Sequence, residues 1–249
     1  MNKKVNAFFD EAKCSAPYIG FFYRIRNNIV NQEKIEWLDE RINNIELQIK
    51  SRNAPYDLIE QTIIQMHDEN IISQREYRKQ ESCMRLIKAL NEGSEKAWSI
   101  DPLLSFNKCY DIISKDKEIE DVRHEFLLAV HELDSDSLIK IHKGARGPKG
   151  IKGISPDKYF FCQTDFLFQN WNPSEDAKTI FQLMAKEKKE IMRAYDIDDS
   201  LNYGPRRLNS ALAHLDYNDY IIDRNWSLGG TDYLFPQVIL TEDAYLEYE

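Results

Sequence analysis

The amino-acid sequence predicts a mainly α protein with small β elements, an α+β fold, arranged in three consecutive regions. Apolar residues recur at helical spacing along almost all of residues 1–93. Regions 94–172 and 173–249 each combine helical stretches with aromatic and β-branched runs beside glycine-containing segments. With 249 residues, 42% of them hydrophobic, the chain is long enough to bury a substantial core.

The first region is predicted to be helical throughout. Apolar residues recur at 4-3-4 spacing along one helix and form a seam, namely Leu38, Ile42, Ile45 and Ile49. A proline-containing break at 51–55 precedes further helices over 56–70 and 74–91, and Gly93 is expected to end the last one. We expect the seam to pair within the chain as a helical hairpin. A homodimer through these N-terminal helices is the alternative.

The middle region is predicted to run from helices into strands. Helices are expected over 102–113 and 118–133, followed by a strand over 137–141. The glycine- and proline-rich stretch 144–153 is predicted to be a loop. Aromatic runs at 159–168 are predicted to be β.

The last region is predicted to contain three helices and two strands. The first helix begins at Ser174, a short one covers 190–195, and a third opens at Gly204-Pro205. Strands are expected over 220–222 and 238–240.

The order of these elements over 174–249 resembles that of the winged-helix superfamily, and residues 98–168 repeat it more weakly. The resemblance implies an N-terminal helical region followed by one or two winged-helix-like units. It also implies binding of a DNA groove or of a partner surface.

The segment after Ile141 carries the clearest concentration of positive charge. Five cations recur there with no acid until Asp157, and we expect them to contact nucleic acid: Lys140, Lys143, Arg146, Lys149 and Lys152. Small residues between them let backbone N–H groups approach phosphates, and the cations release counterions on binding. The alternative is a solvated loop.

The third helix of the last region also carries residues suited to DNA. Arg206, Arg207 and Asn209 are expected to project from its first turns toward base edges, because these side chains make bidentate base contacts. An ordinary exposed face is the alternative. The following loop is more apolar and suits a protein partner through Trp226, Leu228 and Tyr233.

Signals of catalysis and of metal binding are weak. Histidines and cysteines are scattered, H-E-x-x-H is absent, and we expect no metal, no cofactor and no enzymatic activity. Arg123 and His131 resemble the arginine–histidine pair of HEPN-type ribonucleases, with one residue more between them than that family has. No apolar run approaches a membrane span and no signal peptide is seen, so a cytoplasmic protein without membrane contact is expected.

These observations give three hypotheses of function. The first is a non-catalytic winged-helix protein that binds double-stranded DNA, as a regulator or DNA-contacting subunit of a bacterial or phage-related system. The second is a tandem winged-helix adaptor that binds protein partners in a larger complex. The third is a HEPN-like ribonuclease effector. The net charge of −9 favours the adaptor, whereas the local basic residues favour DNA.

Overall fold

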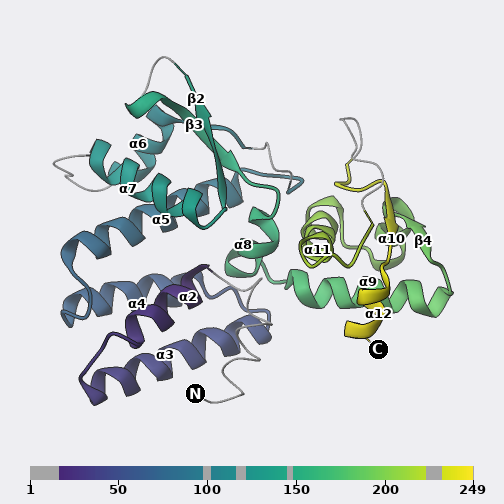
Figure 1. Ribbon diagram of the computed structural model, residues 1–249, viewed down its shortest axis with the longest axis horizontal. Helices are drawn as coiled ribbons and strands as arrows, with labels where there is room; N and C mark the ends of the chain where they lie inside the picture. Colours follow the sequence, from purple (N-terminus) through teal and green to yellow (C-terminus); the bar gives the residue numbers. More distant parts are fainter. Residues whose placement is uncertain (1–16, 98–101, 116–121, 145–147, 223–231, 249) are drawn as a thin grey trace.

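The computed structural model describes residues 17–97, 102–115, 122–144, 148–222 and 232–248. The chain is mainly helical with two small antiparallel sheets, which confirms the predicted α+β class (Figure 1). Two hydrophobic cores form. One gathers residues from Tyr18 to Leu167, and the other gathers residues from Ala177 to Ala244. We call residues 17–168 the first lobe and 173–248 the second lobe; the first two predicted regions therefore contribute to one core.

Four helices open the first lobe: α2 (Pro17–Arg26), α3 (Gln32–Lys50), α4 (Tyr56–Asp68) and α5 (Gln74–Glu92). Local side chains mark where they begin. The Asn31 side chain accepts from the Lys34 N–H before α3, and the Ser73 hydroxyl accepts from the Glu76 N–H before α5. Gly93 ends α5, as its position in the sequence predicts.

The apolar seam of α3 is used inside the chain. Leu38, Ile42 and Ile45 are buried in the first lobe's own core, and Ile49 packs against it. α3 contacts both α2 and α4. The predicted intramolecular packing therefore accounts for this seam, and a homodimer through these helices stays a prediction.

The first lobe continues with a three-stranded sheet and two helices. The elements are β1 (Leu104–Ser105), α6 (Phe106–Ser114), α7 (Val122–Ser135), β2 (Ile139–Lys143) and β3 (Ile151–Pro156). Both sheet neighbours are antiparallel, and β3 lies between β1 and β2. A short 3₁₀ turn, Pro148–Gly150, precedes β3.

The prediction that 144–153 is all loop is wrong at its end, because β3 begins at Ile151. A glycine here is typical of a loop, but Gly153 lies within a strand. It lies in the middle strand opposite Ser105, and a Cβ at this position would collide with the Leu104 carbonyl oxygen. Gly153 is therefore a strand glycine that allows β1 to approach closely.

The prediction of β structure for 159–168 is also wrong, because Phe160–Phe168 form helix α8. Almost every residue of α8 is buried, including Phe160, Phe161 and Phe166. The aromatic runs on either side of Gln163-Thr164-Asp165 are too short to show a periodicity that separates a buried helix from a buried strand.

The second lobe repeats the order of elements seen from α5 to β3. It contains α9 (Pro173–Glu187), β4 (Ile191–Arg193), α10 (Ala194–Leu201), α11 (Pro205–Tyr217), β5 (Gln237–Ile239) and α12 (Glu242–Tyr248). β4 pairs with β5, and Ile221 bridges Leu240. In both lobes a helix, a strand, two helices and two extended segments follow one another, with the last segment in the middle of the sheet.

The short helix expected at 190–195 is instead β4 followed by the start of α10. Met192 is buried opposite Val238, so pairing with a strand distant in sequence decides the conformation. Among the residues described, no helix combines the length and apolar character needed to cross a membrane.

Candidate nucleic-acid interface

The β2–β3 hairpin presents lysines to solvent. Lys140 and Lys143 on β2 and Lys149 and Lys152 around the turn are all exposed. The sequence from Ile139 to Pro156 contains no Asp or Glu, so no acid of the hairpin itself neutralises them. Arg146 lies outside the described residues. The hairpin therefore carries positively charged side chains and no negatively charged ones.

The hairpin's backbone geometry directs these lysines outward. The register shifts between His142 and Lys143, which makes Lys152 the extra residue of a bulge on β3. The Gly144 N–H donates to the Gly150 carbonyl at 2.9 Å and closes the turn. Lys149 adopts a left-handed conformation with φ of 49°. Lys149 therefore holds a backbone conformation that is uncommon for residues other than glycine.

Helix α7 lies beside this sheet and exposes part of its surface to solvent. Its buried face includes Phe126, Val130 and Leu133, and the helix contacts β2. Arg123 and His131 are exposed on its outer side. The sequence reasoning considered these two only as a ribonuclease pair. Both residues belong to the helix that precedes the basic hairpin.

The ribonuclease resemblance gains no geometric support from the helix. Arg123 and His131 are eight positions apart, which at about 100° per residue rotates them by roughly 80° around the axis. They therefore do not stack along one line of α7.

Arg206 does not project into solvent, contrary to the expectation from sequence. Its guanidinium contacts Asp165 at 2.7 Å, the Asn91 carbonyl at 3.1 Å and the Asn91 side-chain oxygen at 3.2 Å, and it also contacts the Ser94 carbonyl. It lies 4.7 Å over the Phe161 ring. Asp165 and Asn91 are fully buried. Arg206 therefore joins the second lobe to α5 and α8 of the first lobe.

Arg207 and Asn209 are likewise engaged within the chain. Arg207 forms two hydrogen bonds of 2.7 and 2.6 Å to the buried Asp176 carboxylate, and its guanidinium lies 3.9 Å over the Tyr203 ring. The Asn209 amide donates to the carbonyls of Lys96 and Asp232, and its oxygen accepts from the Leu234 N–H. Hydrogen-bonding groups of Asn209 thus anchor chain segments from both lobes.

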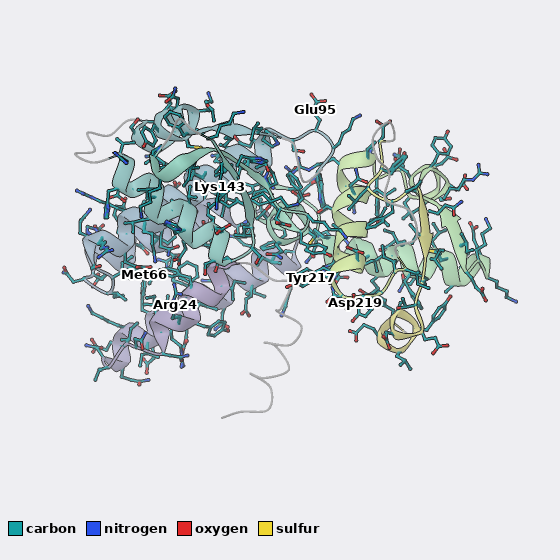
Figure 2. All side chains as sticks on the ribbon, turned by 45° about the horizontal axis from the view of Figure 1, so that its top comes forward. Arg24, Met66, Glu95, Lys143, Tyr217 and Asp219 are labelled. Carbon is teal, nitrogen blue, oxygen red and sulfur yellow. The ribbon has the colours of Figure 1, made fainter. Side chains whose placement is uncertain are left out.

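The expectation that these three side chains point toward a DNA groove is corrected by helix α11 as a whole. Residues 208–215 are all buried, and α11 packs against α8 and α9. The guanidinium and amide groups that read bases well also satisfy several buried acceptors at once, so the sequence alone does not separate the two uses. Figure 2 shows Tyr217, at the end of α11, where the two lobes meet, whereas Lys143 lies on the first lobe.

Of the residues expected to bind a protein partner, Trp226 and Leu228 lie outside the described residues. Tyr233 is half-buried, and its hydroxyl donates to the Asp198 carboxylate at 2.8 Å. Desolvation, followed by this hydrogen bond, raises the pKa of Tyr233. The Tyr233 hydroxyl therefore keeps its proton and donates a hydrogen bond to Asp198 of α10.

No group of three or more potential metal ligands lies together in the described ranges. His214 is buried in α11, and burial lowers the pKa of its imidazole to about 4. Cys83, Cys109 and Cys162 are buried free thiols, and burial raises the pKa of Cys83 and of Cys109. These residues belong to the packed interior.

Comparisons with protein-family models, with curated proteins and with solved structures found no match. The arrangement of the residues themselves is therefore the basis for inferring function.

Proposed function

We propose that this protein binds double-stranded DNA through the first lobe, without catalysing a reaction. The observation that carries the proposal is the acid-free β2–β3 hairpin with its exposed Lys140, Lys143, Lys149 and Lys152. Lysines on a projecting hairpin suit phosphate contacts, which supply most of the affinity for DNA irrespective of sequence.

The order of elements supports the view that each lobe contains a winged-helix-like unit. In a winged helix, a strand between the first two helices pairs with the last strand of a terminal hairpin. The pairing of β1 with β3 and that of β4 with β5 both have this form. In such a unit the third helix enters the groove and the hairpin contacts the flanking backbone.

The two units differ in whether that third helix is available. α11 is buried along residues 208–215, whereas α7 has an exposed side with Arg123 and His131. We therefore assign groove contact to α7 and phosphate contact to the adjoining hairpin. The second unit packs against the first lobe through Arg206 of α11, which pairs with Asp165 of α8.

The overall negative charge is compatible with this local role. A net charge of −9 opposes non-specific coating of DNA by the whole surface. Binding is then confined to the basic hairpin side, with a salt dependence set by a small number of phosphate contacts. Such a protein suits a regulator or the DNA-contacting subunit of a bacterial or phage-related system.

The decisive experiment measures duplex binding against salt by fluorescence anisotropy. The double variant Lys143→Ala/Lys152→Ala should weaken binding to all sequences and reduce the slope of log K against log salt by about 1.8, or about 0.9 per contact. Lys178→Ala/Lys186→Ala, on exposed positions of α9, makes the same charge change elsewhere and should leave the slope unaltered. Equal losses in both variants, or no binding by the unmodified chain at low salt, would refute the proposal.

A second candidate function is the tandem adaptor. Ile191 and Tyr195 are 54% and 66% exposed around β4, whose outer edge has no strand neighbour among the described elements. Open strand edges accept an added strand from a partner, and the flanking apolar side chains give it specificity. Failure of DNA binding in the experiment above would leave this candidate in first place.

A further inference from the structure

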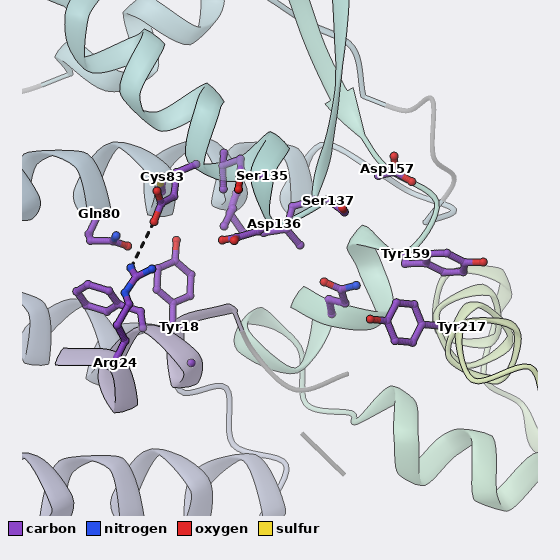
Figure 3. Close-up of a pocket in the computed structure, with 17 residues that line it drawn as sticks. Tyr18, Arg24, Gln80, Cys83, Ser135, Asp136, Ser137, Asp157, Tyr159 and Tyr217 are labelled. Atoms are coloured by element: carbon purple, nitrogen blue, oxygen red, sulfur yellow. Dashed lines mark ion pairs between the residues drawn. The ribbon is translucent and has the colours of Figure 1, made fainter. Parts of the chain in front are cut away.

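A cleft of about 690 Å³ lies between the lobes, away from the basic hairpin (Figure 3). Tyr18 and Phe21 of α2 line one side, and Tyr159 and Tyr217 line the side toward the second lobe. The end of α7 and the segment after β3 supply its carboxylates. The cleft therefore combines aromatic surface with acidic groups and is bordered by both lobes.

The lining carries more negative than positive charge. Its acids are Glu132, Asp136 and Asp157, and its one basic side chain is Arg24. Glu132 already has two cationic partners, with Arg24 at 3.5 Å and Lys79 at 3.2 Å.

The two remaining carboxylates have weaker compensation. Asp157 accepts a hydrogen bond from the neighbouring Lys158 N–H. Asp136 remains accessible to solvent. Desolvation, and after it the nearby Glu132, raises the pKa of its carboxyl, although Arg24 and Lys79 oppose this shift. The Asp136 backbone N–H donates to the Glu132 carbonyl at 3.0 Å, but its carboxylate forms no hydrogen bond or ion pair with another described residue.

The Tyr18 hydroxyl is a second, independent observation that points to ligand binding in this cleft. Tyr18 is only 4% exposed, and its hydroxyl has no hydrogen-bond partner within the described part of the chain. Figure 3 shows the hydroxyl directed between Cys83 and Asp136. Burial raises the pKa of this hydroxyl, which keeps its proton, so the group can donate or accept. Buried polar atoms normally find a partner.

We propose that this cleft binds an organic cation, a primary alkylammonium group. The ammonium would donate hydrogen bonds to the Asp136 carboxylate and the Tyr18 hydroxyl, while its alkyl stem extends along the cleft toward the aromatic side chains of Tyr159 and Tyr217. An ammonium has three donors and no acceptor, which matches one carboxylate and one neutral oxygen. Aromatic faces add attraction to a cation. A divalent metal fits less well, since the described residues bring no three ligands together here.

Free polyamine and the lysine side chain of a peptide share this chemistry. Isothermal titration of the full chain, without DNA, should therefore use spermidine in one arm and a short lysine-containing peptide in the other. The arm with the higher affinity identifies the source. Acetylating the same amines removes the charge and should abolish binding in that arm.

Three variants locate the site. Asp136→Asn should weaken binding by about tenfold, and Tyr18→Phe by about fivefold, as expected for loss of one charged and one neutral hydrogen-bond partner. Asp134→Asn removes the same charge from an exposed position of α7 outside the cleft and should have no effect. Tyr18→Phe deletes only an oxygen without a partner, so its melting temperature should not fall.

The proposal is overturned if neither cation binds the unmodified chain. It is equally overturned if Asp134→Asn and Asp136→Asn lose the same affinity, because binding would then follow net charge and not the cleft.

Discussion

His214 illustrates at the scale of one residue how burial alone sets a protonation state. Its side chain is 6% exposed, and desolvation is the cause that lowers its pKa to about 4. In the unfolded chain an imidazole titrates near 6.5. The unfolded state therefore binds the proton more readily, and folding stability rises with pH through this range.

We expect His214 to make the protein less stable as the pH falls from about 6.5 to about 4. The loss amounts to about 3 kcal/mol, since each unit of pKa difference corresponds to about 1.4 kcal/mol. Urea titrations across this range should show a shallower pH dependence for His214→Gln than for the unmodified chain. Gln182→Ala, which changes an exposed side chain of α9 that does not titrate, should leave that dependence unchanged. An identical pH dependence in both variants would contradict the assignment.

Single residues also show which contacts could not be predicted from the sequence. Arg206, Arg207 and Asn209 were expected to read DNA, and their chemistry as strong donors was recognised correctly. Their acceptors were not visible, because Asn91 is 115 positions and Asp165 is 41 positions from Arg206. Pairing over such distances is a product of the fold, which one sequence does not display.

At the scale of elements, local patterns predicted most helices at roughly the right place, and among the strands they predicted β2 and β5. α3 and α5 carry caps and amphipathic spacing, so their bounds follow from nearby residues. β4 and α8 were assigned the wrong type. Met192 becomes β by pairing with a distant strand, and the run of α8 is buried with no polar face to show a period.

The three-stranded sheet depends on a single glycine. In Gly153→Ala the new Cβ would meet the Leu104 carbonyl, so β1 has to move away from β3. We expect a loss of about 1–3 kcal/mol, typical of overpacking. Gly20→Ala is the control, because nothing lies within 4 Å of the added Cβ and α2 gains helix propensity. Thermal unfolding of both variants tests this, and equal stability in the two would refute the role of Gly153.

At the scale of the whole molecule, the two lobes are joined at both ends of α11 (Figure 1). Arg206 makes the contacts near its start, as described above. Near its end, Asp216 accepts a hydrogen bond from the Tyr159 hydroxyl at 2.8 Å and pairs with Lys158 at 2.5 Å. Because these groups are mostly buried, the lobes are expected to unfold together even though each has its own hydrophobic core.

Removing Arg206 should uncouple the lobes. In Arg206→Ala the fully buried carboxylate of Asp165 loses its charged partner and Asn91 loses hydrogen bonds, at a cost of about 3–5 kcal/mol. Scanning calorimetry should show one transition for the unmodified chain and two for the variant, because the junction fails before either core does. Arg206→Lys should recover little, since an ammonium cannot reproduce the fork that meets Asp165 and the Asn91 oxygens together.

Substitutions of two other arginines serve as controls for Arg206→Ala. Arg78→Ala removes an exposed arginine from α5 and should keep both the stability and the single transition. Arg207→Ala breaks a buried pair with Asp176 inside the second lobe, so it should destabilise that lobe without touching the junction. If Arg206→Ala unfolds in one transition with no more loss than Arg78→Ala, the network around Asp165 does not couple the lobes. The DNA binding proposed for the first lobe would then not need the second lobe, and a fragment ending at residue 168 should bind duplex DNA as tightly as the full chain.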